Sequence, residues 1–169
     1  MNKFFLFSSF LFFSLAFHST GNKFLLNRSA EASYSVTVKS GKGAVTVSGK
    51  GNKFIRGLKS KKNKAIILVF DGNSGDKPTG DNLMFNIIGE TSGDYKFEFD
   101  PKVDKSHKGH AFFQWFRGSA EAEKIGEVFL TSGILHLTIS SNLCSGTVQG
   151  KGANGEVSGS FNNIPLQEK

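Results

Sequence analysis

The residues in this sequence that are best equipped for chemistry are the cations of residues 51–64. This stretch, GNKFIRGLKSKKNK, holds six Lys or Arg among fourteen residues and no acid. A block of like charge creates a local potential that attracts polyanions. Together with the preceding lysine, the cations expected to contact an anionic partner are Lys50, Lys53, Arg56, Lys59, Lys61, Lys62 and Lys64. The alternative is an ordinary solvated loop, because lysine on an edge strand also deters edge-to-edge pairing.

The positive charge of the chain comes from one segment. The formal net charge is +7. Nine cations and no acid lie between Glu31 and Asp71, whereas residues 71–169 carry nine cations and thirteen acids, a net of −4. The sequence therefore predicts a local contact surface for one of three partner classes. These are an anionic polymer such as an acidic glycan, a membrane surface with its lipid head groups, and an acidic protein.

A second candidate site is the aromatic run AFFQWF, residues 111–116. Successive side chains of a strand point to opposite faces, so Phe113 and Trp115 share one side, and Phe112 and Phe116 share the other. Phe113 and Trp115 are candidates for a ligand wall, with Trp115 as a stacking platform for a sugar or an apolar molecule. The alternative is that both faces of this strand are covered by the rest of the protein.

Metal binding has weaker candidates. The loop DGNSGDKPTGDN offers four oxygen donors that suit calcium, Asp71, Asn73, Asp76 and Asp81. A glycine and an aspartate occupy its fifth and sixth positions, where an EF-hand needs a ligand and a glycine, and the same residue types build any long hairpin loop. His107 and His110 form an equally weak pair, because the two lysines nearest to them oppose a cation. We predict no metal and no cofactor.

Signatures of catalysis are missing from the sequence. A phosphate-binding loop needs a glycine and a Ser or Thr at positions that are Ala44 and Gly51 in AVTVSGKG. The segment GEVSGSF has the wrong interval for a nucleophile elbow. We therefore expect a protein that is not an enzyme.

The elements that position these residues are strands. From Tyr34 onward, apolar residues recur at every second position, which predicts half-buried strands. The expected strands cover residues 34–39, 44–48, 65–70, 83–88, 95–100, 111–116, 127–131, 134–140, 143–152 and 156–161. Only residues 118–127 suggest a helix, and a short one. About eight to ten short strands with local turns predict an all-β antiparallel meander that forms a barrel, with a β-sandwich as the alternative.

The last two expected strands form the clearest hairpin. Asn154-Gly155 is a strong signal for a two-residue turn. The resulting register pairs Gly150 with Gly159 and places every apolar side chain on one face. Glycines on that inner face, Gly152 among them, imply either a sharp coil of the sheet or the close approach of another backbone or a ligand.

The chain begins with the layout of a secretory signal peptide. Lys3 precedes an apolar run of residues 4–17, which is shorter than the roughly 20 residues of a membrane-spanning helix. We expect residues 1–21 to be the signal peptide, with cleavage as late as residue 32 as the alternative. Residues 22–169 then form a single all-β domain without a transmembrane segment, exported to the periplasm or secreted. Cys144 is the only cysteine, so the domain has no intramolecular disulfide.

These features predict an exported, non-enzymatic binding or interaction protein whose basic segment contacts an anionic partner. The alternative is a carrier of a small apolar or sugar ligand that uses the interior of the barrel near Trp115, and an uncharacterised enzyme ranks third. Nucleic acid is not expected as the physiological partner, because export removes the chain from it.

Overall fold

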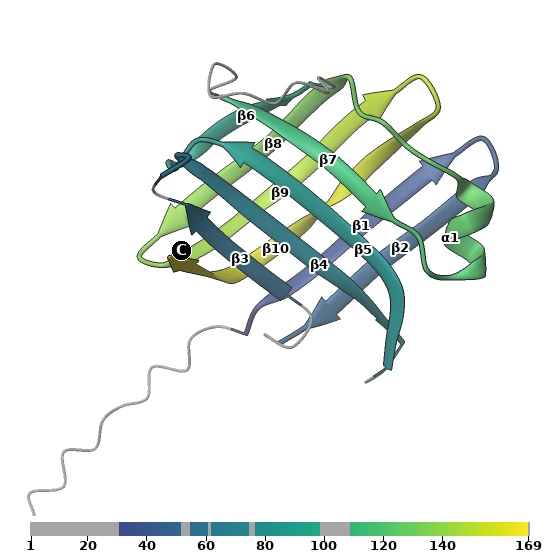
Figure 1. Ribbon diagram of the computed structural model, residues 1–169, viewed down its shortest axis with the longest axis horizontal. Coiled ribbons are helices and arrows are strands. Elements are labelled where there is room, and N and C mark those ends of the chain that lie inside the picture. The colour runs from purple at the N-terminus through teal and green to yellow at the C-terminus, as the bar shows by residue number, and fades with distance from the viewer. Residues whose placement is uncertain (1–30, 52–54, 61, 75–76, 99–108, 169) are drawn as a thin grey trace, which may run out of the picture.

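The computed structural model describes residues 31–51, 55–60, 62–74, 77–98 and 109–168 (Figure 1). The predicted signal peptide lies outside this part of the chain. Four candidate side chains also lie outside it, namely Lys53, Lys61, Asp76 and His107.

Ten strands and one short helix make up the described part of the chain. The strands are β1 (Ser33–Ser40), β2 (Gly43–Lys50), β3 (Ile55–Ser60), β4 (Ala65–Ser74), β5 (Lys77–Ile88), β6 (Gly93–Phe97), β7 (His110–Phe116), β8 (Ser132–Ser140), β9 (Leu143–Gly152) and β10 (Gly155–Glu168). The helix α1 (Ala120–Ile125) lies within the segment expected to be helical. Its cap is Ser119, whose hydroxyl accepts a hydrogen bond from the Ala122 amide at 3.1 Å.

Eight of the strands close into a barrel, which confirms the predicted all-β barrel. Their order around the barrel is β10, β3, β4, β5, β7, β6, β8, β9 and back to β10. The pairings of β10 with β3 and of β6 with β7 are parallel, and the others are antiparallel. β1 and β2 form an additional hairpin that continues the sheet from β10 (Figure 1).

Closure of the barrel depends on the length of β10, which has two different neighbours along one side. Its first half pairs with β1, and its end, from Leu166, pairs with β3. Between the two, Asn163 has a φ of 55°, and the register with β9 shifts between Phe161 and Ile164. An irregularity of this kind bends a strand. The end of β10 therefore turns away from β1 and meets β3.

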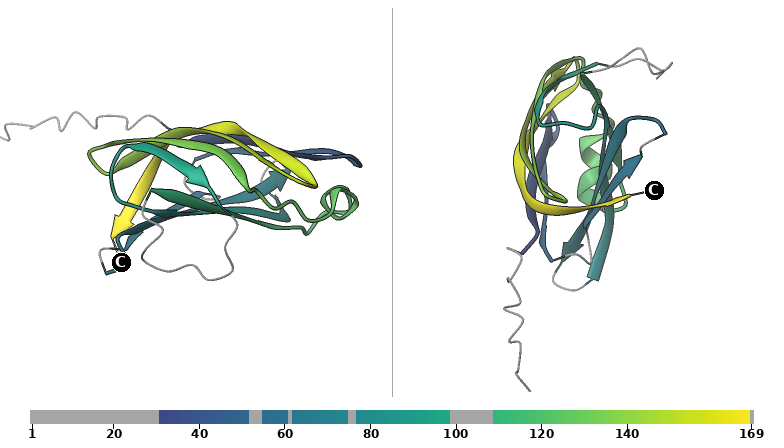
Figure 2. Two further views of the ribbon diagram at one scale, coloured as in Figure 1. Left: turned by 90° about the horizontal axis from the view of Figure 1, so that it is seen from above. Right: turned by 90° about the vertical axis from the view of Figure 1, so that its left-hand side faces the viewer.

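The barrel is flattened and has two broad sides (Figure 2). β1, β2, β8, β9 and β10 lie on one side, and β3, β4, β5 and β7 lie on the other. Aromatic rings connect the two sides: the centroid of Phe70 lies 5.0 Å from that of Tyr34, 5.9 Å from that of Phe85 and 5.5 Å from that of Phe161. All four side chains are buried. The described core is therefore continuous across the barrel, and its stability comes mainly from the burial of apolar surface.

The register predicted for the last hairpin is wrong by two residues. Gly152 pairs with Gly155, and Asn154 lies in the turn between them. The Asn154 side chain accounts for this turn, because its Nδ2 donates to the Glu127 carbonyl at 2.6 Å and its Oδ1 accepts from the Phe129 amide at 3.3 Å. A shift of two residues keeps every side chain on its own face. The division into an inner and an outer face therefore remains correct.

Glycines on the inner face of this hairpin admit another backbone. A Cβ added at Gly159 would lie 2.2 Å from the Ser35 carbonyl oxygen. One added at Gly152 would lie 1.6 Å from the Phe129 carbonyl oxygen. At Gly152 the structure contains the close approach of another backbone, whereas the backbone beside Gly159 is that of its paired strand β1.

Two further expectations differ from the structure. Residues 127–131, expected as a strand, belong to no strand, although Val128 and Leu130 are buried as their alternation predicts. Residues 55–60, for which no strand was predicted, form β3. Ile55 and Gly57 are buried there, and the pattern was hidden because glycine has no apolar side chain at the second inward position.

Candidate functional site

The fold divides the cations of the basic segment among three places. Lys50 ends β2, Arg56 and Lys59 belong to β3, and Lys62 and Lys64 lie in the turn between β3 and β4. Lys50, Lys62 and Lys64 are exposed, whereas Lys59 is half-buried. A segment that is continuous in sequence is thus spread over a strand end, a strand and a turn.

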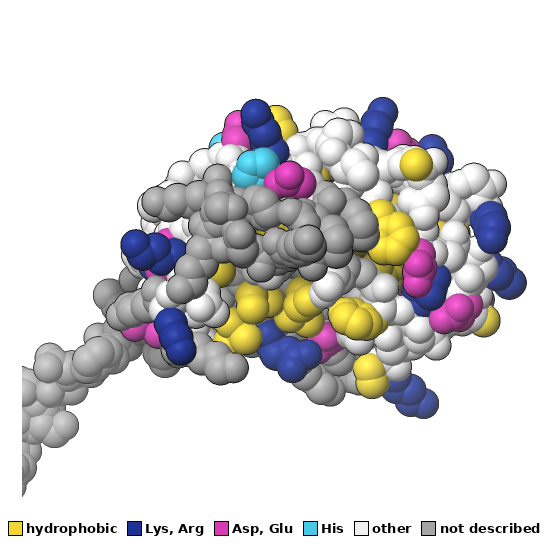
Figure 3. All heavy atoms as spheres, turned by 45° about the horizontal axis from the view of Figure 1, so that its top comes forward, with side chains coloured by type: hydrophobic (Ala, Val, Ile, Leu, Met, Phe, Trp, Pro, Cys, Tyr) yellow, Lys and Arg dark blue, Asp and Glu magenta, His cyan; other side chains and the backbone are white. Residues whose placement is uncertain are grey.

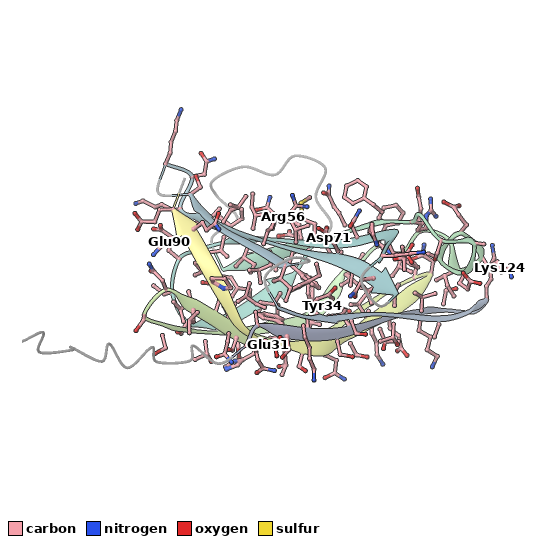
Figure 4. The ribbon with its side chains drawn as sticks, turned by 90° about the horizontal axis from the view of Figure 1, so that it is seen from below. Glu31, Tyr34, Arg56, Asp71, Glu90 and Lys124 are labelled. Atoms are coloured by element: carbon pink, nitrogen blue, oxygen red, sulfur yellow. The ribbon has the colours of Figure 1, made fainter. Side chains whose placement is uncertain are left out.

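Acidic residues from other strands lie beside part of this charge. The Arg56 Nη2 is 3.3 Å and 3.1 Å from the two carboxylate oxygens of Asp71 on the neighbouring strand β4 (Figure 4). The Asn82 amide, oriented to satisfy its hydrogen bonds, donates to the same carboxylate at 2.7 Å. Lys39 Nζ lies 3.3 Å from the Glu156 carboxylate. Exposed pairs contribute only about 0–1 kcal/mol to stability, but they reduce the charge that an external anion meets.

Lys64 lines a pocket of about 520 Å³ at the end of the molecule that carries Glu90 in Figure 4. Residues 88–95 and Gly109 form the rest of its wall. Glu90 and Asp94 face the same space as Lys64, so acidic side chains outnumber the cation in this lining. A pocket of this composition disfavours an anion.

Lys50 lies in a pocket of a different composition, which we call the Lys50 pocket. It has a volume of about 370 Å³ and is formed by β1, β2 and β10. Its other polar side chains are Ser33, Ser35, Ser48, Ser160 and Asn162. No acidic residue lines it, and Lys50 makes no ion pair within the described residues.

Cross-strand pairing builds the Lys50 pocket as two rows of three side chains. Across β2, β1 and β10, the rows are Lys50–Ser33–Asn162 and Ser48–Ser35–Ser160. Residues directly opposite one another in antiparallel strands point to the same face. The alternating residues Tyr34 and Val36 point the other way and are buried in the core. The pocket therefore lies on the outer face of the barrel.

The Lys50 pocket continues into an uncharged outer surface, which we call the polar face. Across β2, β1, β10 and β9 its two rows are Ser48–Ser35–Ser160–Thr147 and Thr46–Thr37–Ser158–Gln149. All eight side chains are exposed or half-buried. The Thr37 and Thr46 hydroxyls lie 2.8 Å apart. Hydroxyl and amide groups both donate and accept hydrogen bonds, so this surface can bind a partner rich in hydroxyl groups.

The opposite broad side of the barrel presents apolar side chains to its exterior (Figure 3). Leu58 of β3, Ile67 and Val69 of β4 and Met84 of β5 alternate with buried core residues and are half-buried themselves. Phe116 of β7 is 55% exposed. The two broad sides of the barrel therefore differ in character, one being polar and the other largely apolar.

The aromatic run of β7 has the two sides that its alternation predicts. Phe113 is buried, and its ring centroid lies 5.4 Å from that of Phe85. Trp115 is half-buried and packs against the same core, and its Nε1 is buried without a hydrogen-bond acceptor among the described residues. Phe112, on the other side, belongs to a smaller apolar cluster. Phe113 and Trp115 therefore both pack against the core of the barrel.

The calcium candidates of the 71–82 loop have separate structural roles. Asp71 is held by the ion pair described above, and Asn73 is half-buried on β4. Asp81 is buried, and its Oδ1 accepts from the amides of Gly118 and Ser119 at 2.8 Å and 2.9 Å. Its Oδ2 accepts from the Ser119 hydroxyl at 2.7 Å, so Asp81 anchors the start of α1. Within the described ranges, no three His, Cys, Asp or Glu side chains gather closely enough to hold a metal ion.

Two histidines pair with carboxylates next to β6. His110 Nδ1 is 2.8 Å from Glu98 Oε2, and His136 Nδ1 is 2.5 Å from Asp94 Oδ1. The predicted partner of His110, His107, lies outside the described residues. The second pair joins β6 to β8 and could not be foreseen from the sequence, because it depends on the register between those strands.

Two buried acids make the stability of the fold sensitive to alkaline pH. Burial raises the pKa of the Cys144 thiol from 9.0 to about 12. Burial and then the charge of Asp71 raise the pKa of Tyr34 from 10.0 to about 12. The Tyr34 hydroxyl also donates a hydrogen bond to the Asp71 backbone carbonyl. Both groups are neutral in the folded chain at pH values where the unfolded chain has begun to ionise.

We therefore expect the free energy of unfolding to be insensitive to these groups below pH 9 and to fall between pH 9 and pH 12. The free energy of unfolding falls because each raised pKa stabilises the folded state only while its group is protonated. This stabilisation is lost as the pH rises to the pKa of the group in the folded chain. Urea unfolding at a series of pH values measures the slope. Cys144→Ala should make the slope shallower, and an unchanged slope would contradict this assignment.

Sequence reasoning identified Lys50 but missed the serines around it. Ser33 and Ser35 alternate with the buried Tyr34, so their outward orientation was predictable. Ser160 and Asn162 come from the far end of the chain and reach the pocket only through the pairing of β1 with β10. That pairing leaves no local signal in the sequence.

The functional assignment of the Lys50 pocket depends on its geometry. None of the helices in the described part of the chain has the length and apolarity that a membrane span requires. No family model, curated protein or solved structure matches the chain.

Proposed function

We propose that this chain is an exported binding protein that holds an anionic glycan in the Lys50 pocket. The observation that carries the proposal is a single cation surrounded by uncharged hydrogen-bonding side chains, without an acid in the lining. The signal-peptide layout of residues 1–21 supports export. The packed aromatic rings of the core are the reason for placing the site outside the barrel.

Lys50 is favoured over the other cations by its surroundings. Arg56 is paired with Asp71, and Lys64 shares its pocket with Glu90. An anion at either position meets a carboxylate as well as the cation, whereas no carboxylate lines the Lys50 pocket. At about 4 Å in water, one such attraction is worth about 1 kcal/mol, and more where solvent is excluded.

A glycan is favoured over the other anionic partners by the chemistry of the lining. Four serine hydroxyls and the Asn162 amide can donate hydrogen bonds to sugar hydroxyls and accept hydrogen bonds from them. The volume of about 370 Å³ falls within the range of roughly 300–1,000 Å³ that is typical of small-molecule sites. The polar face extends the same chemistry along β9, β10, β1 and β2, which suits a polymer with repeated hydroxyl groups.

Changing Lys50 to Glu should weaken binding to an acidic polysaccharide. The change removes an attraction of about 1 kcal/mol and adds a repulsion of similar size, so the affinity should fall on the order of thirty-fold. Retention of the mature chain on immobilised heparin over a salt gradient measures the effect. The native chain should elute when the rising ionic strength screens the contact, and the variant should elute at a lower salt concentration than the native chain.

Two control variants separate this site from general ion exchange. Lys62→Glu makes the same charge change on the exposed turn between β3 and β4, and it should leave retention nearly unchanged. Ser35→Ala with Ser160→Ala keeps the charge and removes two hydroxyls, and it should weaken binding in the same direction as Lys50→Glu. If Lys62→Glu reduces retention and Lys50→Glu does not, the anion binds on the β3–β4 turn and the proposal is wrong.

A membrane surface is the second candidate partner, because the apolar side chain of Leu58 lies on the same strand as Arg56 and that of Ile67 lies on the neighbouring strand β4. Sedimentation with vesicles of anionic phospholipid distinguishes the two. Vesicle binding without heparin binding would favour the lipid surface and overturn the assignment to a glycan.

A further inference from the structure

The strand β2 is an edge strand of the sheet. It is the last strand in the order that runs from β9 to β2, and its strand partner is β1. In Figure 1, β4 and β5 cross in front of it and α1 lies beside its first residue, and β2 contacts all three elements. Among the described residues, no backbone hydrogen bond reaches its other edge. An edge of this kind presents a row of unpaired N–H and C=O groups that can pair with another strand.

The composition of β2 does little to block such pairing. Its sequence, GAVTVSGK, has no proline and a single charge, Lys50, at its last position. Edge strands that avoid association carry charges, prolines or bulges along their length. The pairing of β2 with β1 is regular over all eight residues, from Gly43 to Lys50.

We propose that β2 pairs with β2 of a second copy of this chain, antiparallel and centred on Val47. A two-fold axis perpendicular to the sheet then places Val47 opposite Val47 and joins the two sheets into one. Isologous contacts of this type are the commonest route to dimers. The inner faces of the two copies then lie on the same side of the joined sheet, so the side-chain alternation of β2 continues across the axis.

Charge excludes one neighbouring register. Registers that keep the inner faces on the same side of the joined sheet differ by shifts of two residues in the partner strand. Centring on Thr46 would place Lys42 opposite Lys50 of the second copy, and directly opposed like charges are destabilising. Centring on Val47 places Lys50 opposite Ala44 instead. Thr46 then lies opposite Ser48, so hydroxyl side chains pair on the outer face.

The ends of the paired strands are complementary in charge. In the register centred on Val47, Gly43 lies opposite Gly51 of the second copy, and Lys42 reaches the end of that strand. The Glu31 carboxylate lies 3.7 Å from the position of a Cβ at Gly51. Glu31 and Lys42 are both exposed. The two-fold axis generates this Lys42–Glu31 approach twice.

Pairing through β2 would also enlarge the polar face. The outer faces of the two copies lie on the same side of the joined sheet, so both Lys50 pockets face one direction. This consequence depends on the proposed function, whereas the pairing itself does not. A polymer could then contact both pockets, which raises its apparent affinity without any new contact within a copy.

Paired cysteines and opposite charges test the register. The variant Thr46→Cys with Ser48→Cys should form a disulfide-linked dimer on oxidation, because each cysteine faces its counterpart in the second copy. Cysteines two apart on one strand are too far from each other to form a bond within a copy. Cys144 has no exposed surface, so it does not compete. The control Ser158→Cys, on the interior strand β10, should form no disulfide-linked dimer.

Charge variants give an independent reading by light scattering on a size-exclusion column. The native mature chain should have twice the mass of one copy. Thr46→Glu with Ser48→Glu and Thr46→Lys with Ser48→Lys should each be monomeric, and a mixture of the two should recover the dimer. This recovery shows that the variants remain folded. A native chain that is monomeric and does not cross-link, or a dimer unaffected by the charge variants, would overturn the proposal.

Discussion

Replacing Phe70 by alanine should lower the free energy of unfolding by about 3–5 kcal/mol, the range for a fully buried aromatic side chain. Phe70 has no exposed surface, and its ring contacts Tyr34 of β1, Phe85 of β5 and Phe161 of β10. Its removal leaves a cavity between the two broad sides of the barrel. Urea unfolding followed by far-ultraviolet circular dichroism gives the change in free energy.

Phe116→Ala provides the matched control, because it removes the same side chain from a position that is 55% exposed. Its effect should stay within about 0.5 kcal/mol, as for surface changes in general. If Phe70→Ala cost no more than Phe116→Ala, the core would not be packed as described. A carrier with a ligand inside the barrel would then become the better hypothesis.

Replacing Gly159 by alanine should have the second large effect. The added Cβ would lie 2.2 Å from the Ser35 carbonyl oxygen and 2.6 Å from Val36 Cα, both on β1. Relief requires β1 to move away from β10, since a backbone cannot give way as a flexible side chain can. We expect a loss of about 3 kcal/mol, the upper part of the range for overpacking. Urea unfolding curves measure this loss in the free energy of unfolding.

The same variant should also weaken heparin binding, because β1 supplies the middle of the Lys50 pocket. Gly41→Ala is the control for the change of residue type, since a Cβ at Gly41 meets no atom within 4 Å. It should be neutral or stabilising, because alanine has less conformational freedom to lose on folding. A Gly159→Ala variant as stable as Gly41→Ala would contradict the close approach of β1 and β10.

Alternation of apolar residues was enough to predict most strands and their inward faces. In β1, the buried residues are Tyr34, Val36 and Val38, as YSVTVK implies. β3 was missed because Gly57 replaces a side chain on its inner face. A Cβ at Gly57 would lie 2.7 Å from the Pro165 carbonyl oxygen, a contact made with the last strand of the chain.

The opposite error, at residues 127–131, has a tertiary cause. Their alternation is genuine, because Val128 and Leu130 are buried. The backbone amide of Phe129, however, donates to the side chain of Asn154 rather than to a neighbouring strand. The same side chain sets the turn of the last hairpin and moves its register. Neither effect is visible in local sequence.

The electrostatics of the basic segment could be predicted only in part. Its cations were correctly counted, but the acids that face them come from elsewhere in the chain. β4 returns alongside β3 and brings Asp71 to Arg56, and the turn after β5 brings Glu90 near Lys64. Lys50 remains without an acid in its pocket because β1 and β10 present serines to it. Proximity in space, and not along the sequence, decides which cation is available.

The most direct test of the Lys50 pocket is a nuclear magnetic resonance titration of the ¹⁵N-labelled mature chain with an acidic oligosaccharide. We predict saturable shifts of the backbone amides that line the pocket, those of Ser33, Ser35, Ser48, Lys50, Ser160 and Asn162. The amides of Lys62 and Lys64 should remain unchanged. Shifts confined to the turn between β3 and β4, or no saturable shift at all, would contradict the assignment of the site.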